Sequence, residues 1–159
     1  MQLRKLQWLF PIAVTLHNGE EAIWMPGWAA RHAAQLPVQP PGGATIRFGL
    51  VLLTFLAYAV TYLSDRKGRE SIWAYLLFGG AAAMLLNVFV PHVLATLIFR
   101  SYTPGVVTAV LINFPVMTIL AIRMIREGWV SGWKALAFAV FVPAGLAGTV
   151  PALFLSRLW

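Results

Sequence analysis

Five long apolar segments make up most of this chain, and they limit the folds that it can adopt. A helix needs about 20 consecutive apolar residues to cross the hydrocarbon core of a bilayer, and each segment is long enough. The segments lie at residues 6–25, 44–63, 72–99, 104–125 and 133–155, with short polar or turn-rich connections between them. The sequence therefore predicts one domain over residues 1–159, an all-α membrane protein built as a bundle of five transmembrane helices.

The composition excludes the other broad classes of protein. Hydrophobic residues make up 60% of the chain and charged residues 11%, whereas a soluble domain carries about 25% charged residues. Disordered chains lack this much apolar surface. The absence of cysteine excludes disulfides, thiolate zinc sites and cysteine nucleophiles. The net charge of +7 comes from basic residues scattered between apolar runs, so we expect a lipid bilayer as the partner and no nucleic acid.

Lysine and arginine predict the orientation, because cytoplasmic loops of membrane proteins are enriched in both. With a cytoplasmic N-terminus, 8 of the 12 basic residues lie inside and 4 lie outside. The inner residues are Arg4, Lys5, Arg66, Lys67, Arg69, Arg123, Arg126 and Lys134, and the outer residues are Arg31, Arg47, Arg100 and Arg157. The C-terminus is then outside, and the inner (plasma) membrane of a bacterium is the expected location.

Two glutamates lie inside the first apolar segment, where a charge is costly. A charged side chain at mid-membrane costs about 2.5–3.5 kcal/mol, so ionisable residues there indicate a functional site. At about 100° per residue, Glu20 and Glu21 lie on either side of His17 on one helix face, and Trp24 belongs to the same stripe. Helical bundles combine Glu and His at such spacings to hold metals. We therefore expect His17, Glu20 and Glu21 to be metal ligands.

The third segment carries a second polar pair, Asn87 and His92. In a regular helix the two side chains would point about 140° apart. Pro91 has no N–H to donate to the carbonyl of Asn87, so a kink or a π-bulge is expected here. Either distortion would turn His92 toward the face of Asn87 and make it a fourth candidate ligand.

The residues Tyr102-Thr-Pro-Gly105 predict the start of the fourth helix, with Thr103 as its N-cap. The free amide groups of a helix start can hold an anionic group, and a simple tight turn is the alternative. We expect Glu20, Glu21, Asn87 and Tyr102 to take part in catalysis. The residues expected to bind substrate are Trp24, Arg47, Arg100, Gly105 and Thr108.

These motifs, in this order, resemble those of the HXXEE domain family, which consists of small bacterial membrane proteins. The resemblance is carried by His17-Asn-Gly-Glu-Glu21, by Asn87 and His92, and by Tyr102-Thr-Pro-Gly105 with Thr108. It covers about residues 8–125 and leaves the fifth helix outside. The family usually has three residues between Asn and His, whereas this chain has four, and a bulge at Pro91 would absorb the extra residue. The resemblance implies a candidate membrane enzyme and supplies no substrate.

The leading hypothesis is a membrane-embedded metalloenzyme. A set of two histidines and a carboxylate suits zinc or non-haem iron, and one glutamate could serve instead as a general base. Asn87, Tyr102 and the helix start near Gly105 would orient the substrate. The substrate would be lipid-like and enter from the bilayer, and hydrolysis of an ester, phosphoester or peptide bond is the expected reaction.

Three alternatives stay open, and each uses the same polar residues differently. A metal-free isomerase or cyclase of an isoprenoid or sterol-like substrate would use a glutamate as general acid and aromatic rings beside a carbocation. A small ion or proton transporter would use the His/Glu chain as a path. In a purely structural role, Glu20 and Glu21 would pair with Arg47 and Arg100. A homo-oligomer is compatible with each of these roles. We expect His32 to be a solvated residue of the outer loop and, as a second choice, a further candidate ligand.

Overall fold

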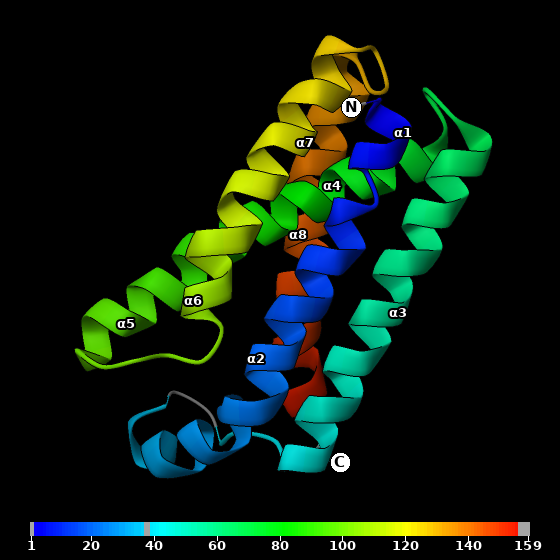
Figure 1. The fold of residues 1–159 in the computed structure, drawn as a ribbon. Helices are drawn as coiled ribbons and strands as arrows, with labels where there is room; N and C mark the ends of the chain where they lie inside the picture. Colours follow the sequence, from blue (N-terminus) through cyan, green and yellow to red (C-terminus); the bar gives the residue numbers. More distant parts are fainter. Residues whose placement is uncertain (1, 37–38, 156–159) are drawn as a thin grey trace.

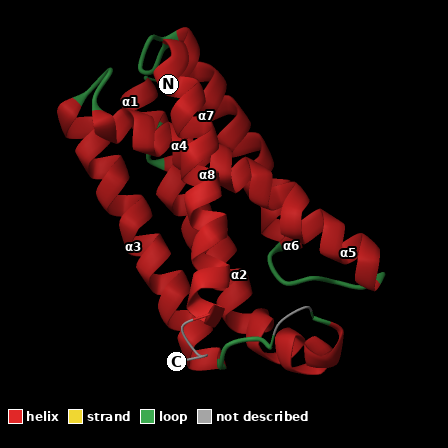
Figure 2. Ribbon diagram, turned by 180° about the vertical axis from the view of Figure 1, so that it is seen from behind, coloured by secondary structure: helices red, strands yellow, loops and turns green. Residues whose placement is uncertain are grey.

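The computed structural model describes residues 2–36 and 39–155, with side chains up to residue 147, and every regular element in this part is helical (Figure 2). The all-α prediction is thus confirmed for the described residues, while Arg157, used above to predict the orientation, lies outside them. Two elements, η2 and η3, are π-helical. In chain order the elements are α1 (Leu3–Leu6), α2 (Leu9–His32), η1 (Ala33–Gln35), α3 (Gly43–Lys67), α4 (Ile72–Asn87), η2 (Val88–Val93), α5 (Leu94–Phe99), α6 (Val106–Thr108), η3 (Ala109–Asn113), α7 (Phe114–Arg126) and α8 (Gly132–Leu155).

Three helices in the described part are long and apolar enough to cross a membrane, where the sequence predicts five. They are Gly43–Lys67, which is α3, Ile72–Phe99, which runs from α4 through η2 to α5, and Val106–Arg126, which runs from α6 through η3 to α7. A shorter apolar helix covers Gly132–Ala147. Helix α2 has the length but is less apolar, because it contains the polar run at residues 17–21. The chain therefore has the long apolar helices of a membrane protein.

Helix α2 continues beyond residue 25, the end expected for the first segment, and passes through Pro26 to His32. Proline inside a helix leaves the carbonyl four residues before it without its donor, and here that carbonyl belongs to Ala22. The guanidinium Nε of Arg47, at the start of α3, donates to the Ala22 carbonyl oxygen at 3.1 Å. An arginine of the neighbouring helix thus satisfies the backbone group that Pro26 leaves free, and the helix can continue.

Helix α4 lies in the middle of the bundle and contacts α3, α7 and α8 (Figures 1 and 2). Its inward residues Ala74, Leu77 and Ala81 are fully buried. At Gly79 the backbone approaches α8 so closely that a Cβ atom would lie 2.6 Å from Val142 Cγ2. Small residues at helix contacts allow this kind of close approach in membrane proteins. The site described below rests on this tightly packed central helix.

The acidic residues outside α2 have local partners at the end of the bundle where α3 meets α4. Asp65 lies 3.8 Å from Arg4, and Glu127 pairs with Arg123. The hydroxyl of Tyr75 donates to Glu70 and lowers the pKa of that carboxyl group. Glu20 and Glu21 remain as the acids inside the helical bundle, so they are the ones that need a functional explanation.

Replacing Gly79 by alanine tests the close contact between α4 and α8. We expect the free energy of unfolding to fall by about 1–3 kcal/mol, because the added methyl group overlaps Val142 and must displace it. Gly49→Ala in α3 is the matched control, since nothing lies within 4 Å of its Cβ position. Thermal unfolding in detergent measures both variants, and equal melting temperatures would contradict the packing described here.

Candidate functional site

The face of α2 expected to carry the site turns toward the polar residues of α4–η2 and α6. His17 is a polar residue in the middle of a largely apolar helix, and it is almost completely buried, with 1% of its surface exposed. The next polar residue, Asn18, points to α3, where its amide donates to the Leu50 carbonyl and to Thr54. Glu21 lies four residues after His17 and shares its face. The helical spacing thus places Glu21 beside His17 as expected, whereas Glu20, expected in the same set of ligands, binds elsewhere.

The distortion expected at Pro91 is present and brings Asn87 and His92 together. Residues Val88–Val93 form a π-helical segment, and Val90 inside it has the non-helical angles φ −130° and ψ 112°. As a result, the amide nitrogen of Asn87 lies 3.0 Å from Nε2 of His92, although the two residues are five positions apart. The prediction of a kink or bulge that turns His92 toward Asn87 is confirmed.

Four side chains from α2 and from the α4–η2 segment meet at one point. The Asn87 amide nitrogen lies 3.1 Å from His17 Nε2 and 3.0 Å from His92 Nε2. The two imidazole rings pack edge to face, with their centroids 4.8 Å apart. A carboxylate oxygen of Glu21 lies 3.5 Å from His92 Nε2 and 3.9 Å from His17 Nε2. His17, Glu21 and His92 each offer a ligand atom here, all within 4.8 Å of one another.

Hydrogen bonding at Thr108 determines which nitrogen of His17 carries its proton. The Thr108 hydroxyl donates to Glu20 Oε2 at 2.6 Å, a shorter contact than the 3.2 Å to the Gly105 carbonyl and one assisted by charge. Its single proton is then used, so it accepts from His17 Nδ1, which lies 3.0 Å away. Nε2 of His17 is left with its lone pair and faces the Asn87 amide group, which has two protons to donate to the two imidazoles.

Glu20 leaves this cluster and holds the start of α6 instead. Its two oxygens accept from the Tyr102 hydroxyl at 2.6 Å, the Gly105 amide at 3.0 Å, the Thr108 amide at 2.9 Å and the Thr108 hydroxyl. The anion expected at this helix start is therefore a carboxylate of the chain itself. Loss of hydration and the bond to Glu20 raise the pKa of Tyr102, so its hydroxyl remains a donor.

Only glycine fits at position 105. Its φ of +89° lies in the left-handed region, where side chains are strained, and a Cβ atom there would lie 2.4 Å from His92 Cε1 and 2.9 Å from His17 Cε1. The same residue donates its amide proton to Glu20. Gly105 thus lets the loop between α5 and α6 lie directly against both imidazole rings.

The residues expected to bind substrate have different places in the structure. Gly105 and Thr108 belong to the site, and Arg47 binds the Ala22 carbonyl as described above. Arg100 is exposed at the end of α5, and Trp24 lines a cavity next to the site. Among the described residues, neither Glu20 nor Glu21 forms the ion pair with Arg47 or Arg100 that the structural alternative requires.

Several buried polar residues of the bundle interior did not emerge from the sequence analysis, among them Gln7, Ser64 and Asn113. Asn113 is fully buried at the end of the π-helical segment η3, and neither polar atom of its side chain has a hydrogen-bond partner. Pro115 is the sequence signal that could have pointed to Asn113. The π-helical segment η3 ends two residues before this proline, and the other π-helical segment, η2, contains Pro91. The helix from α4 to α5 and the helix from α6 to α7 therefore both lose their regular α-helical hydrogen bonding near the site.

The fold and the buried cluster of two imidazoles, a carboxylate and an amide define a helical membrane protein with a polar centre. The chain belongs to the family described as "Protein of unknown function with HXXEE motif", whose model matches residues 8–120. His17, Glu20 and Glu21 fit the spacing of that motif. The chain is 31% identical over 147 residues to "Uncharacterized protein YrkK" from Bacillus subtilis (strain 168), covering 91% of this chain and 90% of the relative. No solved structure matches.

Gly105→Ala tests the contact between the loop and the two imidazoles. We compare it with Gly128→Ala, because Gly128 also has a positive φ (+65°) but has nothing within 4 Å of its Cβ position. The control should lose about 1–2 kcal/mol of unfolding free energy from backbone strain. Gly105→Ala should lose about 1–3 kcal/mol more, because its methyl group overlaps His92. Equal losses in detergent unfolding experiments would contradict the site geometry.

Proposed function

We propose that this protein is a metal-dependent enzyme of the membrane that acts on a lipid-like substrate, with hydrolysis as the reaction class. The observation that carries the proposal is that two buried histidines, His17 and His92, and Glu21 each offer a ligand atom, and these atoms lie within 4.8 Å of one another. Buried imidazole and carboxylate groups without an arginine or lysine partner are costly in a membrane, which favours a functional reason for them.

The donor set supports zinc or iron as the metal. Zinc in catalytic sites is bound by two histidines and a carboxylate with one position open, and iron(II) uses the same ligands. Zinc bonds of about 2.0 Å hold tetrahedral ligands about 3.3 Å apart. The ligand separations here are 3.5 Å, 3.9 Å and at most 4.8 Å, so the side chains would have to move inward to bind zinc. A metal in this position would supply a Lewis acid and lower the pKa of water.

The hydrogen bonds around the three ligands support the same proposal. A metal-binding histidine usually has its other ring nitrogen held by a hydrogen bond, and Thr108 provides this bond for His17 Nδ1, whereas Nδ1 of His92 has no partner. Asn87 faces the point where the ligands meet, and a half-turn of its amide group would present an oxygen in place of the nitrogen. In this proposal Glu21 is a ligand or the general base, Asn87 and Tyr102 orient the substrate, and Glu20 positions His17 through Thr108.

A lipid-like substrate is supported by the surroundings of the site. Phe89 and Val90, in the π-helical segment between Asn87 and His92, are about half exposed on a helix apolar enough to cross a membrane. A substrate dissolved in the bilayer could therefore approach from this side. Beyond the site, inward-facing residues toward the other end of α4 and α7 are apolar and fully buried, among them Leu77, Met117 and Leu120. This packing argues for an enzyme rather than a transporter with a water-filled path.

Metal-free acid–base catalysis is the second candidate function, and the position of Asn87 favours it. The Asn87 amide group already bonds to Nε2 of both histidines, so these two nitrogens have a partner without an ion. Glu21 would then be the acid or base, and an isoprenoid or sterol-like molecule the substrate. Metal content separates the two candidates directly.

Removing single ligands tests the metal proposal. The full-length protein, purified in detergent and loaded with zinc or iron(II), should retain about one equivalent of metal in mass spectrometry. His17→Ala, His92→Ala and Glu21→Gln should each weaken metal binding by more than about 100-fold, since changing a residue that only hydrogen-bonds to a ligand already costs about 10–100-fold. His32→Ala is the matched control, because His32 binds the Trp28 carbonyl outside the cluster.

Two results would overturn the metal proposal. The first is a folded wild-type protein that binds no zinc and no iron, which would favour metal-free catalysis. The second is equal metal content in the wild type, His17→Ala, His92→Ala and the His32→Ala control, because the bound metal would then lie elsewhere.

We also propose that five segments cross the plasma membrane, with the N-terminus in the cytoplasm and the site in the outer half. The lack of cysteine allows a direct test with single cysteines at exposed positions. A membrane-impermeant maleimide should label Gln39→Cys and Ser101→Cys in intact cells, because both lie in loops on the outer side in this orientation. It should label Ser131→Cys only after the membrane is opened. The reverse pattern would contradict the orientation.

A further inference from the structure

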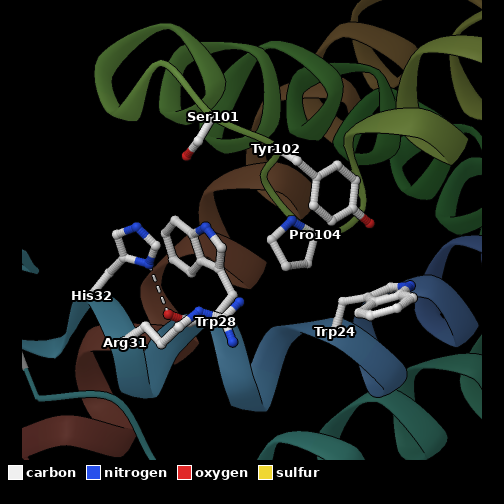
Figure 3. Close-up of a pocket in the computed structure, with 7 residues that line it drawn as sticks. All are labelled: Trp24, Trp28, Arg31, His32, Ser101, Tyr102 and Pro104. Atoms are coloured by element: carbon white, nitrogen blue, oxygen red, sulfur yellow. Dashed lines mark hydrogen bonds between the residues drawn. The ribbon is translucent and has the colours of Figure 1, made fainter.

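A cavity of about 620 Å³ lies beside the site, between the last two turns of α2 and the loop from α5 to α6 (Figure 3). Pockets for small molecules measure about 300–1,000 Å³, so the cavity has the size of a ligand site. None of its residues belongs to the proposed metal cluster. It is lined by Trp24, Trp28, Arg31, His32, Ser101, Tyr102 and Pro104.

The wall formed by α2 is aromatic and held in place. Trp28 is 93% buried, because 7% of its surface is exposed, and its ring stacks on His32 at a centroid distance of 4.5 Å. His32 Nδ1 lies 2.9 Å from the Trp28 carbonyl, and Phe99 packs edge to face against both rings. Trp24, by contrast, is 57% exposed, although it faces the same cavity. A rigid aromatic wall beside an exposed indole ring favours an apolar ligand with a flat or extended body.

The charge of the cavity is positive. Arg31 is exposed and lines the cavity, and no aspartate or glutamate does so. None of the salt bridges of the described residues involves Arg31. Arginine binds carboxylate and phosphate groups with paired hydrogen bonds. The cavity therefore combines an apolar wall with a cationic group that suits an anion.

The cavity and the polar cluster share one wall. The ring of Tyr102 lines the cavity, while its hydroxyl donates to Glu20 at 2.6 Å. Pro104 also lines it, and the next residue, Gly105, lies against both imidazoles. A molecule in the cavity would therefore lie one loop residue away from His17 and His92.

We propose that this cavity binds an anionic amphiphile, with its carboxylate or phosphate group at Arg31 and its apolar body against Trp24, Trp28 and Tyr102. As the substrate class of the neighbouring site, this inference rests on the proposed function. Binding in the cavity does not require the metal, because no proposed ligand lines the cavity.

Fluorescence quenching by brominated lipids tests the proposal on the full chain in a non-ionic detergent. Dibromostearate should quench tryptophan fluorescence in a saturable way, and the uncharged methyl ester should bind about tenfold more weakly, since a charge-assisted hydrogen bond is worth about a factor of ten. Trp24→Phe should remove much of the quenching. Trp133→Phe is the control, because Trp133 is exposed but lies at the start of α8.

Variants of Arg31 separate charge from simple partition into the detergent. Arg31→Gln should weaken binding of the acid about tenfold and leave the ester unchanged, whereas Arg31→Lys should keep most of the preference. Arg126→Gln removes an exposed charge at the end of α7 and should have no effect. Brominated phosphatidate in nanodiscs distinguishes the source of the anion. Saturable quenching by this lipid assigns a membrane lipid headgroup, and quenching by dibromostearate but not by the phosphatidate assigns a free acid.

Quenching that does not saturate, equal binding of acid and ester, or an Arg31→Gln variant that binds like the wild type would overturn this inference. The same titration with His17→Ala separates it from the metal proposal. Binding that persists in this variant supports the cavity even if no metal binds, and metal binding without any lipid binding overturns the cavity alone.

Discussion

The carboxylate of Glu20 joins the two parts of the chain on which the site depends. It comes from the middle of α2 and accepts four hydrogen bonds from the loop and first turn of α6. Charge-assisted bonds of this kind are strong, especially where water is excluded. They hold Thr108 against His17 and bring Gly105 against both imidazoles. The polar cluster therefore has its shape because one partly exposed carboxylate, that of Glu20, holds the loop over it.

Other polar groups of the bundle also find hydrogen-bond partners on neighbouring segments. A backbone or side-chain group that loses its partner in a membrane helix must find another nearby. Arg47 provides one for the Ala22 carbonyl where Pro26 interrupts α2, and Asn87 provides one for both histidines where Pro91 interrupts the helix from α4 to α5. At Pro26 a side chain of the neighbouring helix takes the freed carbonyl, and at Pro91 the distorted helix turns His92 toward Asn87, where the site forms.

Much of the fold and of the site could be predicted from the sequence. Helical spacing placed Glu21 with His17, and the missing N–H of Pro91 explained how His92 could meet Asn87. The different partners of Glu20 and Glu21 could not be predicted, because both residues lie next to His17 on the helix. The position of α6 decides which of the two carboxylates binds the start of α6. The cavity could not be predicted either, since it depends on how the loop between α5 and α6 folds against α2.

X-ray absorption spectroscopy of the zinc-loaded protein tests the central claim most directly, because it reports the atoms around the metal. The account predicts two imidazole nitrogens and at least one oxygen at about 2.0–2.2 Å, with the scattering pattern of imidazole rings. One imidazole should disappear in His17→Ala and one in His92→Ala. A spectrum with oxygen neighbours alone, or one that is the same in all three proteins, would contradict a metal site built from His17, Glu21 and His92.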